Sequence, residues 1–157
     1  MSVTDVPLIE QSARVTRLWL EELAEELGRP HDQRYALHVL RAFLHTLRDR
    51  LPVPETAHLG AQLPETIRGI YYEEWRPSQV PARYHDRDTF FTRLADSGLL
   101  SGETEAAFGA EAVIRILARH LSTDELSKVA DALPRDIAEL LTSSGKEHAG
   151  VDPEDRL

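Results

Sequence analysis

Apolar residues recur every three or four positions along most of the 157-residue chain, and this spacing limits the possible folds more than any other feature. Residues three and four apart lie on one face of an α-helix, so the spacing predicts amphipathic helices with that face buried. The stripe from residue 9 to 27 consists of Ile9, Ala13, Leu20, Leu23 and Leu27, and that from 32 to 51 of Leu37, Leu40, Leu44, Leu47 and Leu51. No sustained run alternates apolar and polar residues as a half-buried strand does. The sequence therefore predicts an all-α protein.

Glycine and proline divide this pattern into short helices. Gly28 can adopt the left-handed conformation that ends a helix. Proline disfavours helix at the residue before it, so Pro64 should break or kink the third helix, which begins near Pro52. Residues 73–86 contain two prolines and no apolar period, which predicts a connecting loop. Further helices are expected over 67–71, 88–98 and 107–120, and a last one should begin at a capping box formed by Ser122 and Glu125.

The leucine and proline pattern of the first half returns seventy residues later. Leu47, Leu51, Glu55, Leu59, Leu63-Pro64, Ile67 and Ile70 correspond in order to Leu117, Leu121, Glu125, Val129, Leu133-Pro134, Ile137 and Leu140. This predicts a helical bundle of two pseudo-twofold repeats, each with two helices plus a proline-broken third. Convergent leucine spacing in an ordinary bundle is the alternative. We expect one domain over 8–143, with repeats at 8–72 and 87–143, and a disordered tail over 144–157.

Composition and charge exclude several classes of function. The chain has no cysteine, which rules out disulfides, iron–sulfur clusters and thiol nucleophiles. Its formal net charge of −9 repels phosphate backbones and argues against general nucleic-acid binding. No apolar run approaches the roughly 18 residues that cross a bilayer, and the N-terminus lacks the pattern of a signal peptide. We expect a cytoplasmic protein without membrane contact.

The second predicted helix carries a stripe of basic and titratable side chains. It consists of His31, Arg34, His38, Arg41, His45 and Arg48, at steps of three and four. Like charges at this spacing cost roughly 0.2–0.5 kcal/mol per pair, so something acidic should face them. One interpretation is that glutamates at 21, 22, 25 and 26 of the first helix cover the stripe. The other is that an anion or a partner's acidic helix docks on its exposed end, near His45, Arg48 and Arg50.

Three blocks of the first half resemble the bacterial family catalogued as domain of unknown function 2267. They are residues 40–52 (LRAFLHTLRDRLP), 58–64 (HLGAQLP) and 68–77 (RGIYYEEWRP). The later Leu133-Pro134 step fits the second half of the family, and the resemblance covers most of residues 8–143. It implies a small, helical, cytoplasmic prokaryotic protein and no particular activity.

The common catalytic and cofactor motifs are missing from the sequence. No serine lies in Gly-x-Ser-x-Gly, and there is no Gly-x-x-x-x-Gly-Lys phosphate loop. Glu55 and His58 have the Glu-x-x-His spacing of di-iron bundles, but the second half offers Lys128 in place of the histidine. We therefore expect neither metal nor cofactor. The alternative is a small-ligand or metal-dependent enzyme centred on Glu55, His58 and His45.

For a helical repeat protein without these motifs, binding through its surface is the main remaining kind of function. The sequence therefore predicts a non-catalytic module that binds a second copy of itself, as a homodimer, or another protein. The predicted binding surface comprises His38, Arg41, His45, Arg48, Arg50, Arg68, Tyr71, Tyr72 and Trp75. Its aromatic members either line a shallow pocket or close the core, since tyrosine and tryptophan bury large areas while keeping a polar tip in contact with water.

Overall fold

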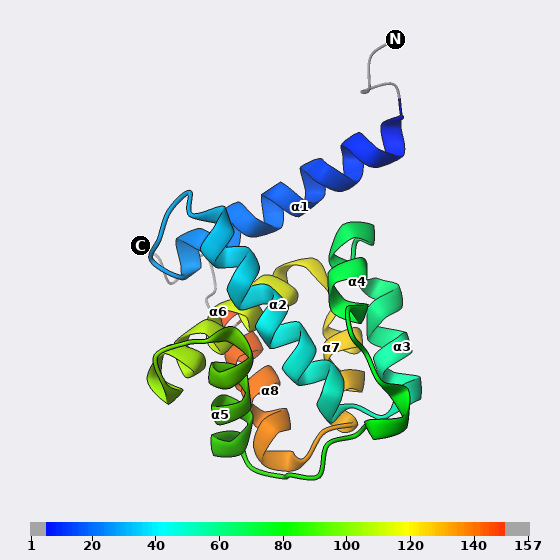
Figure 1. Ribbon diagram of the computed structural model, residues 1–157, viewed down its shortest axis with the longest axis vertical. Helices are drawn as coiled ribbons and strands as arrows, with labels where there is room; N and C mark the ends of the chain where they lie inside the picture. The colour runs from blue at the N-terminus through cyan, green and yellow to red at the C-terminus, as the bar shows by residue number, and fades with distance from the viewer. Residues whose placement is uncertain (1–5, 150–157) are drawn as a thin grey trace.

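The computed structural model describes residues 6–149, and side chains as far as residue 143. Every regular element in this range is a helix, which confirms the all-α prediction (Figure 1). The helices are α1 (Pro7–Glu26), α2 (Gln33–Arg50), α3 (Val53–Gln62), α4 (Glu65–Tyr72), the 3-10 turn η1 (Pro77–Gln79), α5 (Arg87–Gly98), α6 (Glu103–His120), α7 (Thr123–Asp131) and α8 (Arg135–Ala149). Helix α8 continues into the stretch predicted to be a disordered tail, and residues 150–157 lie outside the described range.

The helix ends follow from local backbone chemistry. Gly28 has φ of 72°, the left-handed conformation expected after α1. The break at Pro64 is confirmed, because α3 ends at Gln62 and α4 begins at Glu65. The capping box is half formed: the Ser122 hydroxyl accepts a hydrogen bond from the Glu125 N–H at 3.2 Å. The Glu125 carboxylate lies instead against His58 of α3, with Oε2 2.8 Å from Nε2.

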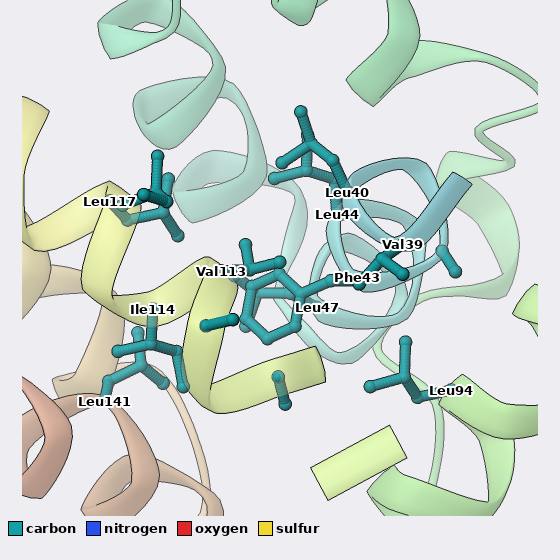
Figure 2. Packing of buried hydrophobic residues seen from close by; sticks show 14 of the residues in the cluster. Val39, Leu40, Phe43, Leu44, Leu47, Leu94, Val113, Ile114, Leu117 and Leu141 are labelled. Carbon is teal, nitrogen blue, oxygen red and sulfur yellow. The ribbon is translucent and has the colours of Figure 1, made fainter. Parts of the chain in front are cut away.

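Helices α2 and α6 form the centre of the hydrophobic core. Figure 2 shows the inner face of α2, from Val39 to Leu47, opposite Val113, Ile114 and Leu117 of α6. Leu94 of α5 and Leu141 of α8 close two other sides of this cluster. Helix α2 belongs to the first half of the chain and α6 to the second. The buried face of each central helix is therefore covered in part by the other half.

The helix starts of the second half repeat those of the first. Helices α2, α3 and α4 begin at Gln33, Val53 and Glu65, while α6, α7 and α8 begin at 103, 123 and 135, seventy residues later in each case. The first helices differ, because α1 has 20 residues and α5 has 12. The spatial symmetry of the two halves stays a prediction.

Helix α1 extends beyond the rest of the domain. Its C-terminal half is buried through Trp19 and Leu23, at 2% and 0% exposure. Its first turns project away from the other helices in Figure 1, and Leu8 and Ile9 are 59% and 63% exposed. The expectation that Ile9 belongs to the buried face is therefore wrong: the apolar stripe continues past the point where neighbouring helices can cover it.

The N-terminal ends of α2 and α6 are joined through Glu105. The Tyr35 hydroxyl of α2 donates to its Oε1 at 2.6 Å, and the Ser101 hydroxyl and backbone N–H donate to its Oε2 at 2.6 and 2.8 Å. These bonds, led by that from the Ser101 side chain, lower the pKa of Glu105 from its ordinary value of 4.5 to about 2. The ionised carboxylate is thus favoured in the folded chain over the unfolded one.

We expect the substitution Glu105→Gln to lower the melting temperature at neutral pH and to have less effect in acid. Because the folded pKa is depressed, the contribution of the carboxylate is complete above the unfolded pKa and is lost as the pH falls towards about 2. Melting curves of both proteins between pH 7 and pH 2.5 measure this, and the difference between the two melting temperatures should narrow progressively below about pH 4.5. A gap that is constant across this range would contradict the assigned role.

Candidate functional site: the cleft between α2 and α5

The basic stripe of α2 meets the carboxyl-terminal ends of two other helices. His45 Nε2 lies 2.7 Å from the Ile70 carbonyl oxygen near the end of α4, and His38 Nε2 donates to the Gly98 carbonyl at the end of α5. Arg48 Nη1 donates to the carbonyls of Tyr71 and Glu73 at 2.8 and 2.6 Å. Terminal carbonyls of a helix lack intrahelical partners and carry its negative dipole end, so donors and cations are favoured there. The stripe therefore holds α4 and α5 against α2.

The glutamates of α1 do not cover this stripe as one interpretation predicted. Only Glu21 meets it, with Oε2 3.1 Å from His31 Nδ1. The more C-terminal acids face α6: Glu22 pairs with His120 at 2.7 Å, and Glu26 pairs with Arg115 at 2.8 Å and with Arg119. The physical reason is that α1 packs on α6 as well as on α2, while backbone carbonyls serve the basic groups further along α2.

Three residues of the predicted binding surface are buried inside the protein. Arg48, Arg50 and Tyr71 are 3%, 8% and 0% exposed, so they cannot form part of an open docking face. Arg50 Nε donates to the Tyr84 carbonyl at 2.8 Å, and the Tyr71 hydroxyl donates to the Thr56 carbonyl at 2.9 Å. The aromatic cluster thus closes the core at Tyr71, which is one of the two roles considered for it.

Arg68 and Tyr72 also act within the first half. Arg68 donates to the carbonyls of Gly60 and Leu63 at 2.7 and 3.0 Å, which caps the end of α3. Tyr72 packs so closely on Gly60 that a β-carbon at this position would lie 2.4 Å from the tyrosine oxygen. Trp75 is half-buried and its ring centre lies 5.4 Å from that of Tyr72. These three residues of the block 68–77 thus make contacts within and between consecutive short helices.

The half-exposed members of the stripe line a cleft that we call the α2–α5 cleft. It runs along α2 past His38, Arg41, His45 and Asp49, between the C-terminal part of α5 and the segment from residue 73 to 84. Its largest section measures about 360 Å³, and an adjoining section of about 230 Å³ is lined by Tyr84. Small-molecule pockets in proteins commonly measure about 300–1,000 Å³.

Four residues of the predicted binding surface line this cleft, whereas the residues of its opposite wall were not predicted. His38, Arg41 and His45 line one section, and the largely buried Arg48 lines the largest section. Arg93 and Ser97 of α5 complete that cleft, although nothing in their spacing marks them. They become neighbours of α2 only through the packing of α5 on it.

Two of the lining residues each have a buried donor atom without an acceptor in the described part of the chain, and Trp75 Nε1, in the segment from residue 73 to 84, is a third. Within residues 6–143, neither Arg41 Nε nor the Tyr84 hydroxyl has a hydrogen-bond partner. Arg41 Nε lies 3.5 Å from Glu73 Oε2, which is an ion-pair distance without hydrogen-bond geometry. Burial raises the pKa of Tyr84 to about 12 in spite of the nearby guanidinium groups of Arg93 and Arg50, so its hydroxyl keeps its proton.

The three residues of the enzyme alternative do not form a common site. His45 contacts the Ile70 carbonyl, whereas His58 contacts Glu125 of α7 across the two halves. Over the residues that the structure describes, no group of three or more histidine, aspartate and glutamate side chains is placed to hold a metal ion. Glu55 lies in the first turn of α3, where an acid is favoured by the helix dipole.

The fold and the cleft define an all-helical protein with a polar pocket between two helices. The family of uncharacterized conserved proteins DUF2267 matches residues 16–140, and the chain belongs to this family. The matched range contains the whole α2–α5 cleft, and it confirms the resemblance of the three sequence blocks. A comparison with curated proteins finds no match. Among the described helices, none combines the length and the apolar character that spanning a membrane requires.

Proposed function

We propose that this protein is a non-catalytic helical module that associates with a second copy of itself through the N-terminal half of α1. The supporting observation is the distribution of exposed apolar side chains. Among the described residues, the large exposed ones are Val6, Leu8, Ile9, Leu18, Val53, Leu99 and Phe108. Three of these, Val6, Leu8 and Ile9, lie together at the start of α1, whereas Leu18 lies in its second half. A cluster at one end of one helix is typical of a contact surface.

The exposed residues continue the buried face of α1. Ile9 lies eleven and fourteen positions before Leu20 and Leu23, close to whole numbers of helical turns, so the three share one side of the helix. Leu20 and Leu23 are buried, whereas Ile9 is 63% exposed. A short helical segment without packing is marginal in water, and a second molecule that covers this face would stabilise it.

A shallow apolar groove adjoins these residues. It measures about 230 Å³ and lies between α1 and the start of α4, with Leu8, Val15 and Pro64 in its wall. The Ser12 and Thr66 hydroxyls, 2.6 Å apart, hold the two helices together at its edge. The groove gives the projecting turn of another copy a place to insert, in addition to contact between the two α1 helices.

Charge favours a second copy over an unrelated partner. Glu10, Arg14 and Arg17 lie on the projecting half of α1, and no ion pair between residues 6 and 143 involves any of them. In two antiparallel α1 helices related by a twofold axis, Glu10 of one copy would lie near Arg14 or Arg17 of the other. A twofold interface requires such a surface to be complementary to itself.

The experiment compares the mass in solution of the wild type with that of the double variant Leu8→Glu and Ile9→Glu. The wild type should have twice the chain mass of 17.7 kDa, and the variant the mass of one chain, because two buried carboxylates would oppose the contact. Sedimentation velocity or light scattering measures this, with circular dichroism to verify that both proteins are folded.

The matched control is Leu99→Asn, which removes an 87% exposed leucine from the end of α5 and leaves α1 unchanged. Asparagine tolerates the left-handed conformation of this residue, so the control should remain folded and dimeric. A wild type that stays monomeric at all accessible concentrations would refute the proposal, as would a double variant with unchanged mass.

We also infer that the chain arose by internal duplication, with the two halves related by a pseudo-twofold axis. The seventy-residue offset of three helix starts supports this, and so does the contact of α3 with α7, which occupy the same place in their halves. His58 and Glu125 join these two helices. The core between α2 and α6 pairs another two equivalent helices.

A further inference from the structure

We propose that the α2–α5 cleft binds a small molecule that carries both a carboxylate and an ammonium group, such as a free amino acid. This goes beyond association through α1 and does not depend on it. Tyr84 lines the 230 Å³ section of the cleft, although it is only 7% exposed. Its hydroxyl is a buried donor without a partner in the described chain, and buried polar groups in folded proteins are nearly always paired. A ligand acceptor would satisfy it.

The position of Tyr84 is fixed independently of its hydroxyl. Its carbonyl accepts from Arg50 Nε at 2.8 Å, and its N–H donates to the Ala82 carbonyl at 3.2 Å. The Ala82 N–H in turn donates to the Asp49 carbonyl at 2.8 Å, which ties this loop to the end of α2. The backbone therefore holds the ring at the wall of the cleft, and among the described residues no hydrogen bond of the hydroxyl takes part in this.

A cation lies over the ring of Tyr84. The guanidinium carbon of Arg93 lies 4.7 Å from the centre of the Tyr84 ring, and both residues line the same section. An arginine and a neutral phenol next to each other provide several donors in a small space, which suits a carboxylate. The Arg41 Nε, a second buried donor without an acceptor, lines the neighbouring section past His45.

The rest of the cleft carries charges of both signs, which argues against a simple anion: Arg76 and Arg93 line it together with several acids. Asp49 and Asp96 line the same section as Tyr84, and Glu74 lines the adjoining one. Asp49 already accepts from Arg48 Nε at 2.9 Å, but Asp96 and Glu74 are exposed at the rim. The section also lies near the carboxyl-terminal ends of α2 and α5, where helix dipoles favour cations. A ligand with an ammonium group near Asp96 and a carboxylate near Tyr84 and Arg93 matches both features.

The test measures melting temperature during titration with each of the twenty amino acids, with acetate and methylammonium chloride as single-charge controls at the same ionic strength. At least one amino acid should stabilise the protein, and neither control should do so to the same extent, because each satisfies only one end of the cleft. Equal stabilisation by acetate, or none by any of these compounds, would overturn the proposal.

The variant Tyr84→Phe separates binding from folding. Without ligand it should melt at or above the temperature of the wild type, because the hydroxyl that it removes has no partner. Its affinity for the stabilising amino acid should be about tenfold weaker. The control Tyr72→Phe changes a tyrosine outside the cleft and should bind as the wild type does. A Tyr84→Phe protein that melts well below the wild type, or that binds equally well, would refute the assignment.

Discussion

The substitution Arg48→Met should lower the free energy of unfolding by about 2–4 kcal/mol, because it removes a buried cation that donates hydrogen bonds to the carboxyl-terminal end of α4. Arg48 is 3% exposed and donates to the Tyr71 and Glu73 carbonyls and to the Asp49 carboxylate. Methionine retains most of the length and the apolar contacts of the side chain but offers no donor. The two carbonyls at the end of α4 would lose their partner, and α4 would be held to α2 less firmly.

Urea denaturation of the two proteins measures this loss. The matched control is Arg34→Met, on the same helix and the same stripe but at an exposed position, where a change within about 0.5 kcal/mol is expected. Equal losses in both variants would show that the stripe contributes through its overall charge and not through the capping contacts of Arg48.

The substitution Phe43→Ala should lower the free energy of unfolding by about 3–5 kcal/mol, since it removes a large side chain from the contact between α2 and α6. Phe43 is 1% exposed and meets Phe90 of α5 edge to face, with ring centres 6.0 Å apart. Figure 2 shows it between the two central helices, close to Val113. The cavity would lie where three elements meet, so the surrounding side chains could not easily collapse into it.

The comparison for this variant is Phe108→Ala on α6, where the aromatic ring is 48% exposed. Its cost should stay below about 1 kcal/mol, because surface substitutions usually have small effects. Thermal or urea unfolding of both variants tests the difference. Similar losses at the two positions would contradict the assignment of α2 and α6 as the centre of the core.

The helices were predictable because their signals are local. Leucine spacing predicted a helix over residues 32–50, and α2 spans Gln33–Arg50. Proline acts on its own residue and on the one before it, so the break between α3 and α4 could be placed at Pro64. The interpretation that the α1 glutamates cover the basic stripe holds for Glu21 but is wrong for Glu22 and Glu26, because their partners on α6 lie 98 and 89 residues away.

The candidate site was harder to predict, because its contacts involve backbone atoms and distant residues. The partners of the basic stripe are mostly backbone carbonyl oxygens and not acidic side chains. Every residue has a carbonyl oxygen, so no sequence pattern shows which of them will accept a hydrogen bond. His45 and Arg48 find theirs at Ile70 and Tyr71, where α4 happens to end. The spacing of apolar residues along α1 likewise does not indicate which part of the stripe other helices cover. Only the structure shows that the stripe is buried at Leu20 and Leu23 and exposed at Ile9.

The arginine contacts at the ends of α3 and α4 have a consequence for alkaline solution. Arg68 and Arg48 hold these ends with guanidinium groups. In general, a guanidinium group holds its proton in more alkaline solution than the ammonium group of a lysine does. The chain contains sixteen arginines and only two lysines, so the electrostatic support of its short helices should persist in strong base until other groups ionise.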